Sequence, residues 1–170
     1  MKSTAILLSL LLPGTASESS LRGSDIEERE LAYATRKEGW LAAHNTRRST
    51  FHSSQGVATV PLVWSAALKR EAATLAKSMR DNNCEIAIPP NMVYGINAQA
   101  RMMYPNLPTT QWAVNQWEEG SRGYTQTVWK ATEYVGCADA FKSSDVPSER
   151  CSVSVCLYAK VRGVDCVEID

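Results

Sequence analysis

Apolar residues recur with helical spacing between residues 65 and 83 of the chain. Ser65 suits an N-cap position, and the apolar positions after it fall at i, i+4, i+7, i+8 and i+11, namely Leu68, Ala72, Leu75, Ala76 and Met79. The run Asp81-Asn82-Asn83 supplies a stop signal. The pattern predicts an amphipathic helix whose leucine and methionine stripe packs in the core and is not a cofactor site.

Residues 151–161 alternate between apolar and polar side chains with period two. One face carries Cys151, Val153, Val155, Leu157, Ala159 and Val161, whereas Cys156 lies on the opposite face. Residues 134–140 suit the preceding strand, and residues 141–150 suit a polar connecting loop. The pattern predicts a hairpin in which Cys151 and Cys156 reach different partners, because they face opposite ways.

The region before residue 50 has the marks of a long helix. Ser24 and Glu27 have the spacing of a capping box, which predicts the start of a helix that runs to about Arg48. One face of this helix would carry Trp40, Ala43, His44 and Arg47. We interpret His44 as a packed, hydrogen-bonded structural residue and His52 as a surface residue in a polar loop.

Composition narrows the class of protein. The 170 residues are 44% hydrophobic, which fits one globular domain with a core. Lys plus Arg and Asp plus Glu number 18 each, so nothing indicates a polyanion-binding surface and we expect no nucleic-acid partner.

The N-terminus has the pattern of an export signal over residues 1–17. Lys2 precedes an apolar run from Ala5 to Leu12, a Pro-Gly break and small residues follow, and cleavage is expected at Ala16 or Ser17. The apolar run is much shorter than the roughly 20 residues that span a bilayer as a helix. We therefore expect a secreted, extracellular protein that does not span a membrane.

Export makes the five cysteines candidates for disulfides. An odd number leaves at least one of them over. Four cysteines alone allow three pairings, so the residues themselves leave the connectivity open.

One stretch, GYTQTVWKATEYVGCA at residues 123–138, resembles the signature of the CAP superfamily, which comprises cysteine-rich secretory, antigen 5 and pathogenesis-related 1 proteins. The segment His44-Asn45-Thr46-Arg47 is similar to the first-helix motif of that family, and Leu62-x-Trp64 also follows its pattern. The resemblance covers about residues 40–163. It implies an α+β fold, a three-layer αβα sandwich around a central antiparallel sheet. We place that CAP (SCP) domain at residues 39–165, after an extension with the start of the first helix at 18–38 and before a short tail at 166–170.

The resemblance also implies the disulfide pairs. They are Cys84 with Cys151 and Cys137 with Cys156, which leaves Cys166 free or in an intermolecular bond. A pair between Cys137 and Cys156 sets small residues against branched ones across the hairpin: Ala138 against Val155 and Ala140 against Val153.

The family's metal tetrad is degenerate in this chain. Relatives with an intact site draw two histidines and two glutamates from separate motifs. The corresponding positions here hold Ile88, Ile96 and Gly123, and the nearby carboxylates of Glu118 and Glu119 are out of register. The resemblance therefore implies no metal, no cofactor and no catalytic residue, since too few ligands or acid–base groups would converge.

Two further segments bear on binding. Only a short segment separates Trp117 from Tyr124, so the rim of the cleft is cut back, and Thr109 or Thr110 is expected to start a third helix. Before that helix, Met102, Met103 and Tyr104 suit an adaptable apolar surface, near a loop that binds sterol in several relatives, or else they pack under the loop.

These observations favour a secreted, non-enzymatic binding protein whose partner is a sterol, another lipid or an extracellular protein. One alternative is a secreted hydrolase or protease that uses residues outside the tetrad. Another is a structural or interaction protein of the extracellular space that dimerises through Cys166.

Overall fold

The computed structural model describes residues 18–104, 106–120 and 126–160. The chain forms two compact units, residues 1–34 and 35–170, and the first is described only through the part of helix α1 (Glu18–Ser54) that precedes residue 35. The expected signal segment, Gly123, Val161, Cys166 and the C-terminal tail lie outside the described residues. Within the described ranges, no helix combines the length and apolar character that crossing a bilayer requires.

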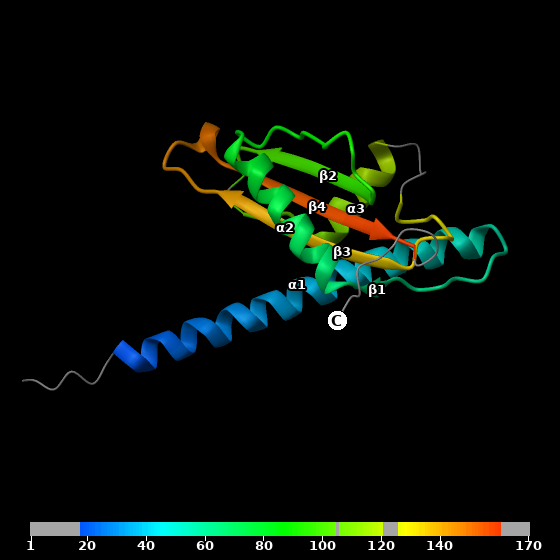
Figure 1. Cartoon of the computed structure of the whole chain (residues 1–170), viewed down its shortest axis with the longest axis horizontal. Helices are drawn as coiled ribbons and strands as arrows, with labels where there is room; N and C mark the ends of the chain where they lie inside the picture. Colours follow the sequence, from blue (N-terminus) through cyan, green and yellow to red (C-terminus); the bar gives the residue numbers. More distant parts are fainter. Residues whose placement is uncertain (1–17, 105, 121–125, 161–170) are drawn as a thin grey trace, which may run out of the picture. The chain divides into compact units, whose positions relative to one another are not determined.

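A four-stranded sheet with the order β1-β3-β4-β2 forms the centre of the second unit (Figure 1). Its strands are β1 (Val63–Trp64), β2 (Gly95–Met102), β3 (Tyr134–Lys142) and β4 (Cys151–Ala159). β4 pairs antiparallel with both β2 and β3, and Cys137 stands opposite Cys156 as predicted, with Ala138 opposite Val155 and Ala140 opposite Val153. The hairpin and its register are therefore confirmed.

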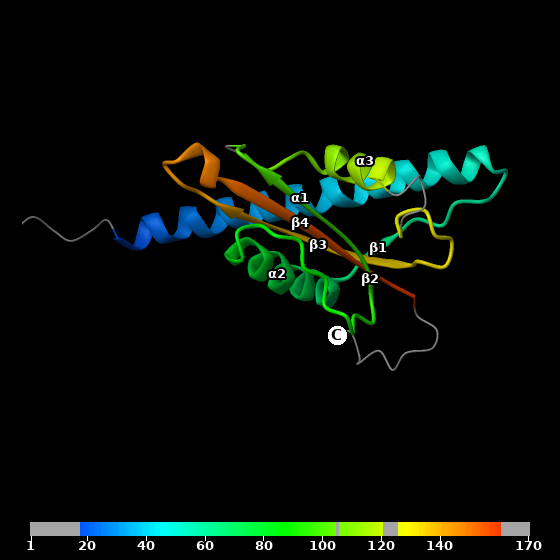
Figure 2. The ribbon, with the colours of Figure 1, turned by 90° about the horizontal axis from the view of Figure 1, so that it is seen from above.

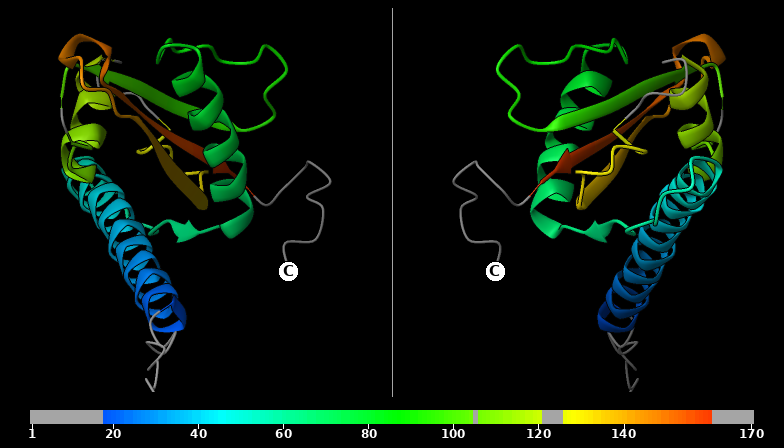
Figure 3. Two further views of the ribbon diagram at one scale, coloured as in Figure 1. Left: turned by 90° about the vertical axis from the view of Figure 1, so that its left-hand side faces the viewer. Right: turned by 90° about the vertical axis from the view of Figure 1, so that its right-hand side faces the viewer.

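Helices cover both faces of the sheet, which confirms the αβα layers (Figures 2 and 3). Helix α2 (Ala66–Asp81) packs on one face, over a cluster of Leu68, Ala72, Ala76, Met79, Cys84, Ala138, Cys151, Val153, Val155 and Leu157. Helix α3 (Thr110–Gly120) and residues 35–54 of α1 pack on the other, over Trp40, Ala43, Leu62, Ala113, Val114, Trp117, Val135, Cys137, Cys156 and Tyr158.

The sheet is mixed, whereas the sequence led us to expect a purely antiparallel sheet. The short strand β1 runs parallel to β3, with Val63 beside Tyr134. A parallel neighbour requires a long crossover, and here the chain passes through α2, β2 and α3 before it returns as β3. A two-residue strand carries too little alternation for its direction to be predicted.

The predicted helix starts are confirmed for α2 and α3. Ser65 caps α2, because its hydroxyl accepts a hydrogen bond from the Leu68 N–H at 3.2 Å. Thr109 acts in the same way at α3, where its Oγ1 accepts from the Trp112 N–H at 3.2 Å. The leucine and methionine stripe of α2 lies in the core, as the spacing predicts.

Helix α1 is longer than predicted, and this corrects the interpretation of His52. The helix begins at Glu18 and ends at Ser54, so Ser24 lies inside it. His52 is only 3% exposed, and its Nε2–H donates to the Val128 carbonyl at 2.9 Å. The prediction of a surface histidine in a loop was wrong because the helix continues past Arg48, which puts His52 one turn further along the buried face.

Disulfides join Cys84 to Cys151 and Cys137 to Cys156, the two pairings that the resemblance implies. The first lies on the α2 side of the sheet and ties the end of that helix to the start of β4. The second lies on the opposite side and links the two central strands. Each face of the sheet is thus crosslinked separately.

Candidate functional site

A buried chain of polar groups runs from α1 through β4 to β2. His44 is fully buried, and its Nδ1 lies 2.7 Å from the Trp40 carbonyl. A carbonyl oxygen only accepts, so Nδ1 carries the proton and Nε2 accepts from the Tyr158 hydroxyl at 2.8 Å. The Asn97 amide in turn donates to the Tyr158 oxygen at 3.0 Å. These residues come from three elements, and their bonds hold the first helix to the sheet.

Burial sets the protonation states of His44 and Tyr158 in this chain of hydrogen bonds. The pKa of His44 is lowered to about 4, chiefly by desolvation. The hydrogen bond to the Trp40 carbonyl opposes this shift, and the nearby Arg48 cation adds to it. Burial also raises the pKa of Tyr158 well above its usual value. At neutral pH the imidazole is therefore uncharged and the phenol protonated, a state suited to structural bonds and not to proton exchange with a substrate in solvent.

The predicted carboxylates behave differently from each other. Glu118 is buried, and its Oε2 lies 3.0 Å from an Arg47 terminal nitrogen, so its charge is paired. Glu119 is exposed and accepts a hydrogen bond from Gln116 at 2.9 Å. Neither arrangement presents an unpaired carboxylate inside a recess.

The described positions of the predicted degenerate cleft lie on both sides of the sheet. Ile88 is 51% exposed on the segment between α2 and β2, whereas Ile96 packs with the α2-side cluster. Glu118 belongs to α3 on the opposite side of the sheet. Gly123 lies outside the described residues.

One cluster of metal-ligand types occurs among the described residues. Donor atoms of His44, Cys137 and Cys156 lie within 4.8 Å of one another. Both sulfurs are joined in a disulfide, and a metal requires thiolates. The cluster in this oxidised form is a structural contact between α1 and the central strands.

The fold and these buried contacts can be compared with known proteins. The model of the cysteine-rich secretory protein (CAP) family matches residues 41–158, well over half of the chain. The chain belongs to the CAP family.

Individual CAP relatives agree with this assignment. The STS14 protein of Solanum tuberosum is 32% identical over 114 residues, which are 58% of this chain and 50% of that protein, so the chain spans about half of its length. Two solved structures share the fold. MpPR-1i has a TM-score of 0.51 at 20% identity, with 74% of this chain and 87% of that chain covered. BmVAL-1 has a TM-score of 0.56 at 17% identity, with 74% and 76% covered.

The CAP domain of this protein presents apolar side chains on the segment 85–94 that joins α2 to β2. Figures 2 and 3 show this segment on the α2 side of the sheet. Ile86, Ile88 and Val93 are exposed on it, by 37%, 51% and 68%. Met92 and Tyr94 pack against the α2-side cluster and anchor its end. The segment is therefore a supported apolar surface.

Sequence reasoning missed two polar anchors of the CAP domain. Arg48 is fully buried and donates to carbonyls of the segments around residues 60 and 127–132. Arg36 forms a bidentate ion pair with Asp139, in which Nε donates to Oδ2 at 2.8 Å and a terminal nitrogen donates to Oδ1 at 2.9 Å. Arg48 follows His44 by one helical turn and so lies on the same face of the helix. That spacing could have predicted the burial of Arg48.

The buried state of His44 predicts a pH-dependent stability. Its pKa is near 4 in the folded protein and about 6.5 in the unfolded chain, so between these values only the unfolded chain binds the proton. Stability from this residue is complete above about pH 6.5, falls as the pH drops, and levels off near pH 4, for a total of about 3 kcal/mol.

Urea denaturation of wild type and His44→Gln at about pH 7.5 and about pH 4.5 measures this contribution. Glutamine can make both hydrogen bonds of His44 without titrating. We expect the variant to lose less stability on acidification than wild type. Carboxylates that titrate in this range are common to both proteins. An equal loss of stability in wild type and variant would therefore contradict the contribution assigned to His44.

Proposed function

We propose that this protein is an extracellular, non-catalytic CAP protein that binds an apolar ligand, a sterol or another lipid, on the segment 85–94. The observation that carries the proposal is the exposure of Ile86, Ile88 and Val93 on a segment anchored at both ends. Apolar side chains grouped on the surface of a soluble domain favour contact with an apolar partner.

The start of this segment is held in place. Asn83 and Cys84 have φ angles of 52° and 60°, in the left-handed region that residues other than glycine seldom adopt. The disulfide of Cys84 to Cys151 retains that turn. A surface that is already ordered loses less conformational entropy on binding, which supports a role in recognition.

The tetrad positions support a non-catalytic role. Where CAP proteins with an intact site carry cation ligands, this chain has Ile88, Ile96 and Gly123. The nearby carboxylate of Glu118 is paired with Arg47. These residues offer a divalent cation one engaged carboxylate at most, and they offer a substrate no pair of acid and base.

An extracellular location is supported by the expected signal at residues 1–17 and by the disulfides, which persist in oxidising compartments. A protein partner on the same apolar segment is the main competing occupant. Dimerisation through Cys166 stays a separate proposal, which non-reducing electrophoresis would test.

Replacement of Ile88 and Val93 by aspartate is expected to lower sterol affinity at least about tenfold, because two exposed apolar contacts become charged. Thermal unfolding should hardly change, since both side chains are exposed. Saturation binding of a fluorescent sterol to the purified protein is the measurement, with Val63→Asp, another exposed valine on β1, as the matched control.

Absence of saturable sterol or fatty-acid binding by wild type would reject the lipid proposal and leave the protein partner. Hydrolysis of a peptide or ester panel that is lost in Glu118→Gln with Glu119→Gln would instead favour the enzyme alternative.

A further inference from the structure

Exposed apolar side chains also gather at the end of the domain where β2 finishes. Met102, Met103, Tyr104 and Leu107 are exposed by 44%, 66%, 47% and 41%, and all lie between the last residue of β2 and the start of α3. Single exposed apolar residues are normal, but a group on one short segment marks an interaction surface. These four residues are the terminal apolar patch.

The backbone of the terminal apolar patch is held in position. Met103 has a φ of 65°, and its N–H donates to the Arg150 carbonyl of the β3–β4 hairpin at 2.8 Å. The guanidinium carbon of Arg101 lies 3.3 Å from the centroid of the Tyr104 ring. The outward direction of these side chains is thus supported from the adjacent hairpin and from β2.

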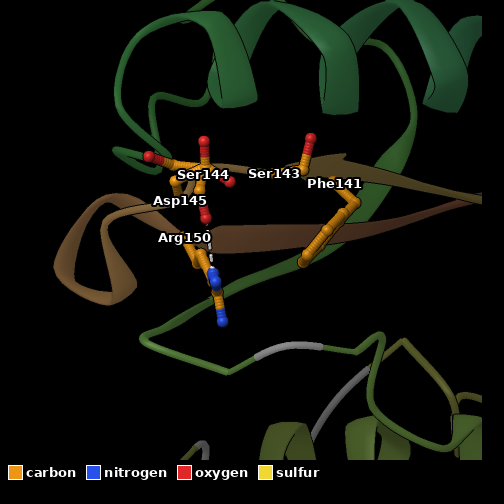
Figure 4. A pocket seen from close by; sticks show the side chains of 5 residues that line it. All are labelled: Phe141, Ser143, Ser144, Asp145 and Arg150. Atoms are coloured by element: carbon orange, nitrogen blue, oxygen red, sulfur yellow. Dashed lines mark hydrogen bonds between the residues drawn. The ribbon is translucent and has the colours of Figure 1, made fainter.

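An open cavity of about 440 Å³ lies in the same hairpin, lined by Phe141, Ser143, Ser144, Asp145 and Arg150 (Figure 4). The Nε of Arg150 donates to the Ser144 carbonyl at 2.6 Å. Among the described residues its two terminal nitrogens have no hydrogen-bond partner. Arg150 and Phe141 extend to the same side of the hairpin in Figure 4. The guanidinium of Arg150, with hydrogen-bond donors available, therefore lies beside the terminal apolar patch.

The formal charges of the connecting residues 141–150 balance, because Lys142 and Arg150 are offset by Asp145 and Glu149. Attraction of this loop to an anionic surface through its net charge is therefore small, and the chemical fit depends on the guanidinium of Arg150. One guanidinium can bind one phosphate, while the neighbouring apolar side chains enter an apolar phase.

We propose that the terminal apolar patch and Arg150 dock this protein on the surface of a phospholipid bilayer. Met103 and Tyr104 enter the headgroup layer, and Arg150 binds a lipid phosphate. Tyrosine favours the boundary between headgroups and acyl chains. The apolar residues belong to a segment at the end of the sheet, which suits insertion into a deformable interface, whereas the main contacts of protein partners usually fill recessed pockets. This inference concerns residues other than 85–94 and does not depend on sterol binding.

Flotation of the purified protein with phosphatidylcholine vesicles tests the proposal. We expect wild type to float with the vesicles and Met103→Ser with Tyr104→Ser to bind about tenfold more weakly, because two inserted apolar groups are lost. Arg150→Gln should weaken binding about fivefold, and Arg150→Lys, which keeps the charge without the bond to Ser144, should weaken it less.

Val63→Ser is the matched control, because Val63 is 57% exposed and pairs with the first residue of β3, at the opposite end of that strand from the patch. Its vesicle binding should equal that of wild type. Because the charges of residues 141–150 balance, a minor fraction of phosphatidylglycerol should raise binding only modestly.

Wild type that stays with the aqueous fraction would overturn the proposal, as would equal binding by the double serine variant and wild type. An equal loss in Val63→Ser would do the same, because binding would then be nonspecific. Leu107→Ser tests the same surface if the double variant proves unfolded by circular dichroism. Sterol binding that persists in the patch variants would show that the two surfaces act separately.

Discussion

Alanine in place of Gly136 is expected to destabilise this CAP domain by at least about 3 kcal/mol. A Cβ at this position would overlap the Lys69 backbone nitrogen and lie 2.6 Å from the Leu68 carbonyl carbon. Both atoms belong to the first turn of α2, where hydrogen-bonded backbone cannot move aside as a flexible side chain can. The helix would have to shift away from β3 and open the core between them.

Urea denaturation followed by tryptophan fluorescence, with the disulfides intact, measures this effect. Gly39→Ala is the matched control, because a Cβ there would meet only the Thr110 side chain, at 3.1 Å, and alanine favours the helix by about 1 kcal/mol. We expect the control to stay close to wild type. A Gly136→Ala variant as stable as wild type would show that α2 and β3 are not packed backbone to backbone.

Methionine in place of Arg48 is expected to cost about 3 to 5 kcal/mol. The guanidinium is fully buried, and burial lowers the pKa of Arg48, yet every acceptor around it is a neutral backbone carbonyl. These acceptors are Val60 and Thr127, each at 2.9 Å, Trp129, also at 2.9 Å, and Thr132 at 3.2 Å. The variant would leave these carbonyls without the guanidinium donors, and the hydrogen bonds to Thr127 and Thr132 are buried.

Lysine at position 48 should recover only part of this loss, since one ammonium cannot reach carbonyls on two segments in the planar arrangement of a guanidinium. Arg70→Met is the control, because Arg70 lies exposed on α2 and its replacement should change stability by less than about 0.5 kcal/mol. Chemical denaturation of the three variants gives the comparison. Stability of Arg48→Met within that margin would mean that other groups organise residues 127–132.

Local pattern was sufficient for α2 and for the hairpin of β3 and β4. Helical spacing from Ser65 to Met79 and period two after Cys151 each reflect one buried face, and both elements appear in the structure, with the predicted N-cap at Ser65. The register of the hairpin followed from the Cys137–Cys156 pair that the family resemblance implied. The disulfide pairs came from the family resemblance and not from spacing, because several pairings satisfy the same cysteines.

Helix α1 shows where local pattern fails. Its buried face carries His44, which was predicted to be packed and hydrogen-bonded, and also Arg48 and His52, polar residues that suggest solvent when considered alone. They are buried because distant carbonyls of residues 127–132 and the Tyr158 hydroxyl supply their partners. Partners this far apart in sequence cannot be inferred from composition or period.

The candidate site also has features that the sequence predicts and features that only the fold decides. The loss of tetrad residues at positions 88, 96 and 123 is a property of the sequence. That Ile96 faces the α2 side while Glu118 lies on the other, and that Ile88 and Val93 are exposed, depends on how each strand and loop is covered. Burial of a side chain is set by what packs on it, and residues remote in sequence do that packing.

The amino-acid order alone specified the amphipathic elements, because these depend on side-chain periodicity over a few residues. Its resemblance to the CAP family implied the fold, the disulfide pairs and, through the Cys137–Cys156 pair, the hairpin register. Assembly in three dimensions specified the parallel β1, the backbone contact at Gly136 and the carbonyl set around Arg48. The same holds for the two exposed apolar surfaces. Each of these results from contacts between segments separated by tens of residues, where excluded volume and hydrogen-bond satisfaction act only once the chain has folded.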